Sequence, residues 1–341
     1  MIILVLSAMA GESKILAPYL NDLSHQNDNE RFQQLASHLL LSAGTPANWG
    51  QIGGSTPDGL GLAKADSSLP YELDVDKVTR LNSENDFSLP YSELWKSLGV
   101  HDVAFQIEVK TIFELSIQLI SSTILENETR CEFSVTTKKS GMPISTDLCG
   151  YAFVNNFAVS VVSSTSSNGV GSIEVDIPNS ESGPALLMVF AKAKVNPQMV
   201  SFNVYAFGFN SSAPLPNRTF TRLSPLNYVL NASLINSNIQ ILNAQVFTFN
   251  YNFSLTEKAQ GIQTLEYYIP RLADSSPMII VLAGNDGSTS FVEWVAYPQL
   301  PIRVGANFNE SIAGAKIVSL SHVVTINNAL YEVVTKWGGI D

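Results

Sequence analysis

Hydrophobic and polar residues follow a helical period near the start of the chain and an alternating period from about residue 103. A wholly polar run, HQNDNER, interrupts the helical part, and Pro18 should kink it. Gly44 followed by Pro46 predicts its end. We therefore expect one long N-terminal helix over residues 1–44. Its two apolar stripes are Ile15, Leu16, Tyr19, Leu20 and Leu23, and Phe32, Leu35, Ala36, Leu39 and Leu40.

Residues 45–102 are rich in Gly and Pro and show little periodicity, which predicts an irregular collar around the base of the next domain. Two short helices are expected within it. The first covers Leu73–Leu81 and is capped by Asp74 or Asp76. The second covers Tyr91–Leu98 and stops at Gly99.

Strict alternation of apolar and polar residues from residue 103 predicts β-strands, as in VAFQIEVK, EFSVTT and SIEVDI. A Pro-rich stretch at 211–225 predicts a linker, after which strand patterns resume. We therefore expect a mainly β protein in which the helix precedes two immunoglobulin-like β-sandwich domains, residues 103–212 and 213–341. The cleanest alternation predicts one strand that buries Phe247, Phe249, Tyr251, Phe253 and Leu255 on a single face.

Composition narrows the function classes. Of 341 residues only 14% are charged, and Ser, Thr and Asn take their place, as is typical of extracellular β proteins. The net charge of −11 and the scattered basic residues argue against a nucleic-acid partner, which needs a basic stripe to replace counterions. They argue equally against a polybasic membrane patch.

The two cysteines, Cys131 and Cys149, flank a segment that reads as strand, turn and strand. A disulfide formed in an oxidising compartment is the first interpretation, and two unrelated buried thiols are the alternative.

No residue pattern indicates a catalytic, cofactor-binding or metal site. The four histidines, His25, His38, His101 and His322, are dispersed, and none lies near the cysteines. The sequence therefore predicts a non-enzymatic protein without a cofactor.

Six Asn-X-Ser/Thr sequons are candidate glycosylation sites. Asn, Ser and Thr are so frequent that a similar number would arise by chance. The six are Asn127, Asn210, Asn217, Asn231, Asn252 and Asn309.

The blocks LLLSAGTPANWG, GLGLA and YELDVDKVTRLN of residues 39–82, with LGVHDVAFQIEVKTIFELSIQL at 98–119, resemble archaeal type IV pilin-like surface proteins. In that family a hydrophobic N-terminal helix anchors the precursor in the membrane and then packs against its copies. The β-rich domain faces outward and is often glycosylated. The chain departs from the pattern because no basic leader precedes a cleavage site and no early glutamate occurs before Glu12.

The resemblance implies an assembly element in the first apolar residues. The run MIILVLSAMAG is too short to span a bilayer, which needs about 20 residues. It is either the end of a signal peptide or the second half of a membrane helix, and the resemblance favours the latter. The assembly residues would be Ile2, Ile3, Leu4, Val5, Leu6, Ile15, Leu16, Tyr19, Leu20 and Leu23.

The hypothesis is a structural, pilin-like subunit of an archaeal cell-surface filament or envelope that assembles as a homo-oligomer through its N-terminal helix. It would be extracellular at the cell surface, with membrane anchoring through its N-terminus expected before assembly. The alternative is a surface adhesin, a glycan- or protein-binding module that does not polymerise. A secreted hydrolase ranks last because no acid–base pair or triad can be named. The second apolar stripe, Phe32–Leu41, is expected to dock on the chain's own β domain.

Overall fold

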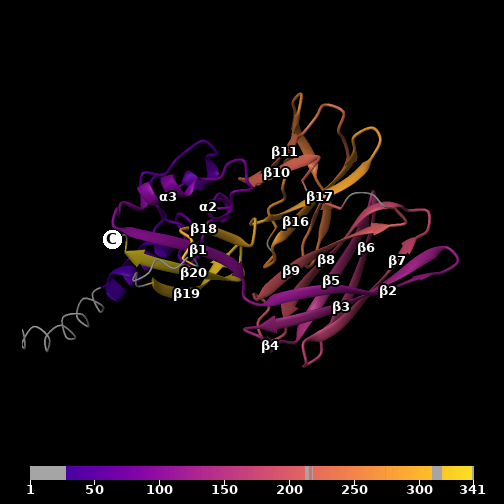
Figure 1. The fold of residues 1–341 in the computed structure, drawn as a ribbon, viewed down its shortest axis with the longest axis horizontal. Coiled ribbons are helices and arrows are strands. Elements are labelled where there is room, and N and C mark those ends of the chain that lie inside the picture. The colour runs from indigo at the N-terminus through magenta and orange to yellow at the C-terminus, as the bar shows by residue number, and fades with distance from the viewer. Residues whose placement is uncertain (1–27, 212–214, 217, 273, 309–316, 340–341) are drawn as a thin grey trace, which may run out of the picture.

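The computed structural model describes residues 28–211, 215–216, 218–272, 274–308 and 317–339. Within these residues the protein is mainly β, with five antiparallel sheets of four strands each (Figure 1). Short helices are confined to the N-terminal third.

The base sheet joins the two ends of the described chain. Its central strands pair over their full length, from Val103 opposite Gly339 to Thr111 opposite Tyr331. The helix over residues 28–41 packs against this sheet, and the collar helices belong to the same hydrophobic core. The strand order is β18 (Ile302–Gly305), β1 (Val103–Thr111), β20 (Ala329–Gly339) and β19 (Ile317–Ile326), and the collar holds η1 (Trp49–Gln51), α2 (Val75–Thr79) and α3 (Tyr91–Leu98).

Four further sheets, here numbered I to IV, extend away from the base (Figure 1). Sheet I contains β2 (Glu114–Ile124), β3 (Glu128–Lys139), β4 (Met142–Pro143) and β7 (Val170–Pro178). Sheet II contains β6 (Phe157–Ser164), β5 (Thr146–Val154), β8 (Gly183–Ala193) and β9 (Val200–Phe209). Sheet III contains β13 (Asn252–Ser254), β12 (Gln240–Phe247), β16 (Met278–Asn285) and β17 (Ser290–Tyr297). Sheet IV contains β10 (Thr221–Leu226), β11 (Val229–Leu234), β15 (Thr264–Tyr268) and β14 (Thr256–Gln260).

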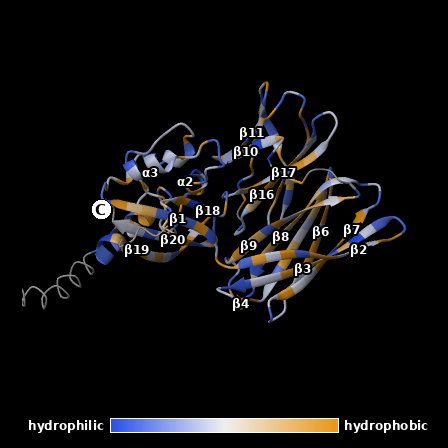
Figure 2. Ribbon diagram, viewed as in Figure 1, coloured by the Kyte–Doolittle hydropathy of each residue, from blue (hydrophilic) through white to orange (hydrophobic). Residues whose placement is uncertain are grey.

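The central strands of the stack are buried on both faces. On β8, Leu187 and Val189 pack into the core shared with sheet I, whereas Leu186 and Met188 pack into the core shared with sheet III. A third core joins sheets III and IV to the base. Such strands read as continuous apolar runs, and Figure 2 shows long hydrophobic stretches along the strands of the stack.

The predicted fold class of a long N-terminal helix followed by two immunoglobulin-like sandwiches is wrong. Within the described residues the helix near the N-terminus is short, residues 28–41, and its stripe from Phe32 to Leu40 packs on the base. Contacts cross the predicted boundary at 213, since β1 pairs with β20 and sheets II and III share a core. Alternation shows which residues form strands but not which strands pair.

The collar helices were predicted well. The first forms at Val75–Thr79, where the side chain of Asp74 accepts hydrogen bonds from the backbone N–H groups of Asp76 and Lys77 at 2.9 and 3.1 Å. The second, Tyr91–Leu98, ends at Gly99, whose φ of 75° is the left-handed conformation that glycine adopts readily.

The predicted continuous strand Phe247–Leu255 is wrong. β12 ends at Phe247, and the chain reverses through a turn in which the N–H of Thr248 donates to the carbonyl of Tyr251 at 2.8 Å. Phe247 is fully buried, whereas Tyr251 and Phe253 are 49% and 43% exposed. The hydroxyl of Thr248 accepts the N–H groups of the turn, a role that alternation alone does not reveal.

Side-chain truncations at the two ends of this hairpin should have different effects on the stability of the protein. Phe247→Ala removes a ring from the core between sheets II and III and should lower the free energy of unfolding by about 3–5 kcal/mol. Tyr251→Ala should change it by no more than about 1 kcal/mol, since half of the ring is already in water. Urea denaturation midpoints measure both, and equal shifts would contradict this placement of the hairpin.

Candidate functional site

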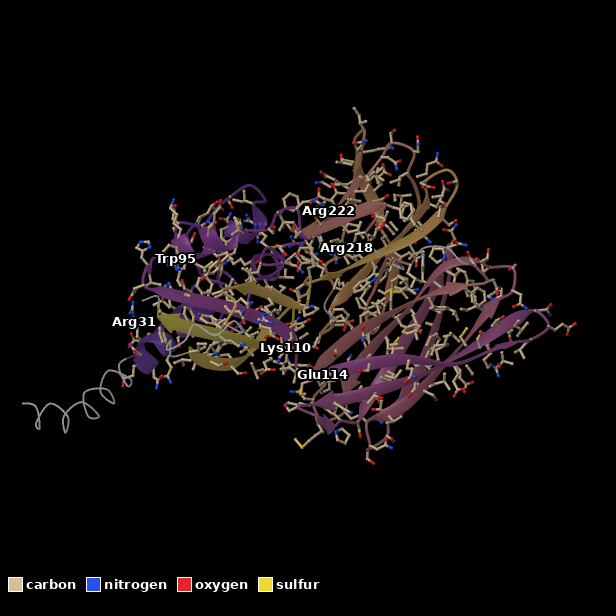
Figure 3. All side chains as sticks on the ribbon, in the orientation of Figure 1. Arg31, Trp95, Lys110, Glu114, Arg218 and Arg222 are labelled. Carbon is tan, nitrogen blue, oxygen red and sulfur yellow. The ribbon has the colours of Figure 1, made fainter. Side chains whose placement is uncertain are left out.

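The base sheet carries the helix over residues 28–41. Phe32 stacks on Trp337 of β20, with ring centroids 6.5 Å apart. On the rim, Arg31 donates from both terminal nitrogens to Asp102 at 2.7 Å, and this hydrogen bonding lowers the pKa of Asp102 (Figure 3). The predicted docking of the second apolar stripe on the chain's own β domain is therefore confirmed. The residues predicted to drive assembly, Ile2 to Leu6 and Ile15 to Leu23, lie outside the described residues.

Two buried cations hold the irregular collar in shape. The guanidinium of Arg80 donates to five backbone carbonyls, those of Trp49, Ile52, Gly53, Ser55 and Phe87, at 2.5 to 3.3 Å. Burial lowers its pKa. Arg80 thereby supplies hydrogen-bond donors to the carbonyl groups of this irregular segment. Without it, water would have to reach these carbonyls.

Lys77, also beside the Trp49 ring, performs the same task. Its ammonium, 6.0 Å from the ring centroid, donates to the carbonyls of Ala43 and Ala63 at 2.8 and 2.7 Å. The Trp49 indole N–H donates in turn to Gly61 at 3.0 Å. Four of the five charged residues of YELDVDKVTRLN, namely Asp74, Asp76, Lys77 and Arg80, are thus interior groups, whereas a charged short helix would ordinarily be placed on the surface.

A buried acid joins the collar to sheets III and IV. Asp76 on α2 accepts the hydroxyl of Tyr297 at 2.6 Å and the backbone N–H of Asn227 at 2.7 Å. Burial raises the pKa of Asp76 to about 6, against the opposing effect of these hydrogen bonds. Burial also raises the pKa of Tyr297 well above its ordinary value. The sequence suggested a helix cap at most, because nothing local marks Asp76 as a contact between distant elements.

A polar hollow lies between the collar and sheet IV. One part, about 490 Å³, lies between the collar turn and β10, and an adjoining part of about 390 Å³ reaches β17. Arg218 forms an ion pair with Glu84, and Arg222 donates to Asp86 at 3.0 Å (Figure 3). Glu293, buried on β17, accepts the backbone N–H groups of Phe220 and Thr221 at 3.0 and 2.8 Å.

The charged side chains of this hollow connect two elements of the fold. Both arginines belong to the segment entering sheet IV, and both carboxylate partners belong to the collar turn, so the pairs fasten one element to the other. Side chains 26–62% exposed make pairs of this kind worth little individually. The arrangement resembles a structural contact more than a site that activates a water.

The predicted disulfide is wrong. Cys131 and Cys149 are free thiols in two different cores. Cys131 on β3 faces the core between sheets I and II, whereas Cys149 on β5 faces the core between sheets II and III. Burial raises the pKa of both thiols, which makes them poor nucleophiles.

The sequons occupy different surroundings. Asn127 in the β2–β3 turn and Asn252 on β13 are exposed. Asn210 is exposed but donates its amide to the carbonyl of Glu181 at 3.3 Å. Asn231 is half-buried within β11, and Asn217 and Asn309 lie outside the described residues.

Titratable residues do not converge elsewhere in the described structure. Among the described residues no three His, Cys, Asp or Glu side chains are grouped so that they could hold a metal ion. His322 on β19 stacks on Tyr71, His101 lies beside Trp95, and His38 is exposed on the helix over 28–41. His25 lies outside the described residues.

Comparison with profiles of known protein families and with curated proteins found no match.

The thiols allow a direct chemical test. We expect no alkylation of the native protein, because Cys131 and Cys149 are 2% and 5% exposed. After denaturation without reductant, intact mass should show two alkylated thiols. An unmodified denatured protein with a mass two hydrogens lower would instead establish the disulfide.

Asp76 should make stability depend on pH between about 4 and 6. The folded chain keeps the Asp76 proton up to about pH 6, whereas the unfolded chain releases it near 3.8. The folded state therefore binds more protons in this window, and the free energy of unfolding falls as pH rises through it. The contribution is present in full below pH 4 and lost above 6, and is on the order of 2–3 kcal/mol.

Asp76→Asn should abolish that slope while keeping an oxygen to accept the two hydrogen bonds. Urea denaturation from pH 4 to 7 measures it. Asp102→Asn is the matched control, because a lowered pKa makes stability fall as pH decreases, which is the opposite sign. An unchanged slope in the Asp76 variant would contradict the assignment.

Proposed function

We propose that this chain is a non-enzymatic structural subunit of a cell-surface filament or envelope, held by its N-terminal segment with the β body facing outward. The observation that carries the proposal is that the molecule has two distinct ends. The first described residues and the end of β20 lie at one end, and sheets I and II lie at the other (Figure 1).

The base holds the helix that follows the proposed N-terminal attachment segment. Phe32, Ala36, Leu39 and Leu40 are buried in its core, so the helix over residues 28–41 is part of the folded body. The double ion pair of Arg31 with Asp102 sets the helix against the loop before β1. The start of this helix therefore lies at the end of the body opposite sheet I (Figure 1).

The far end has the surface of a displayed domain. On β3 of sheet I the buried residues alternate with Glu132, Ser134 and Thr136 on the outer face. This is the half-wet pattern of a sheet that faces water on one side. The low share of charged residues in the chain agrees with an extracellular setting.

Membrane attachment is also a proposal. No helix within the described ranges is long and apolar enough to cross a bilayer. The apolar run MIILVLSAMAG and the stripe Ile15–Leu23 lie outside those ranges, and they are the segments proposed to bury in a membrane or against copies of the chain.

Removal of residues 1–27 tests the proposal. The full chain should self-associate in plain buffer or need detergent, because the proposal buries its apolar stripe in a membrane or against copies of the chain. A chain beginning at Asp28 should be monomeric and should unfold at the same urea concentration as the parent in detergent. Light scattering and sedimentation measure assembly.

Charge substitutions show whether assembly depends on the apolar character of the N-terminal segment or only on its length. Full-length Leu16→Lys with Leu20→Lys should behave like the shortened chain, whereas Gln26→Lys in the polar run should still assemble. A monomeric full chain in plain buffer at high concentration would refute the proposal, as would continued assembly after residues 1–27 are removed.

A further inference from the structure

The β12–β13 hairpin presents two aromatic rings to solvent. Tyr251 and Phe253 are 49% and 43% exposed. Their ring centroids are 5.9 Å apart and the ring planes differ by 28°. By contrast, the ring of Phe247, the last residue of β12, is fully buried. An exposed, nearly parallel pair is therefore unusual for this chain.

The turn that carries the pair is tightly held. The Thr248 hydroxyl accepts the N–H groups of Asn250 and Tyr251 at 3.3 and 3.0 Å. The N–H of Phe249 donates to the hydroxyl of Ser276 at 3.0 Å, and the Asn250 amide donates to Asp274 at 2.8 Å. A platform fixed in this way loses little conformational entropy when a ligand binds.

The β12–β13 hairpin that carries the rings contains no charged residue. Asn250, Asn252 and Ser254 are all exposed on the same hairpin and can donate or accept hydrogen bonds. Two half-exposed rings fall far short of the roughly 800 Å² per partner that a stable protein interface buries. Their size and surroundings instead match a single sugar ring with its hydroxyls.

We propose that Tyr251 and Phe253 form a binding platform for the pyranose rings of a neutral polysaccharide. The negative face of an aromatic ring attracts the slightly positive C–H groups on the flat side of a sugar. The Tyr251 phenol, on the same side of the strand as the Phe253 ring, can then donate to and accept from the sugar hydroxyls at the rim. The platform belongs to sheet III, so it does not depend on assembly through the N-terminal segment.

Affinity electrophoresis of the full chain, in the detergent that keeps it monomeric, tests the platform. The native gels contain hydroxyethylcellulose, arabinoxylan, galactomannan or dextran, and polygalacturonate serves as an acidic comparison. At least one neutral polysaccharide should retard the parent chain. The double variant Y251A/F253A should weaken binding at least about tenfold, a difference of about 1.4 kcal/mol.

Two further variants keep the test decisive. Y251L/F253L retains apolar volume without rings and should lose binding while unfolding at nearly the parent urea concentration. Tyr268→Ala, a 54% exposed aromatic residue on β15 outside the hairpin, should bind as the parent does. The proposal is overturned if no neutral polysaccharide retards the parent, if only polygalacturonate does, or if the leucine variant binds unchanged. It is overturned equally if the ring substitutions alter only self-association of the chain.

Discussion

The pairing of β1 with β20 is the constraint on which the rest of the molecule depends. It joins residues 103–111 to residues 331–339, so the base sheet is complete only when nearly the whole chain has been placed. Contacts of such separation carry a high loop-closure entropy and are made slowly. The helix over residues 28–41 docks on a surface that contains Trp337 of this last strand. The N-terminal part of the body is therefore stable only after the C-terminal part has folded.

The collar meets a different difficulty, because it has many backbone polar groups and little regular structure. Burial of Arg80 and Lys77 costs hydration free energy, but each cation is surrounded by carbonyl oxygens that need donors. Asp76 then ties the same segment to Tyr297 across the interior. The irregular loop is thus ordered by three charged side chains on or beside one short helix.

Local structure in this chain was predictable and long-range structure was not. The Asp74 cap, the Gly99 stop and most alternating strands depend on neighbouring residues, and the structure has them. Strand partners depend on the whole chain, so the pairing of β1 with β20 and the separation of Cys131 from Cys149 were missed. The Phe247–Leu255 alternation failed because one threonine hydroxyl favoured a turn. The polar hollow had no sequence signal, since Arg218 and Glu84 meet only through tertiary folding.

The position of β1 between β18 and β20 also has a mechanical consequence. A pull applied at residue 28 and resisted at sheet I would pass along β1, which connects the base to β2. Antiparallel hydrogen bonds run perpendicular to the strands, so a load along β1 strains the bonds on both of its sides together, in shear. Such bonds yield collectively, whereas bonds at the end of a hairpin open one at a time. A body anchored at its base would therefore transmit tension through hydrogen bonds that are loaded together.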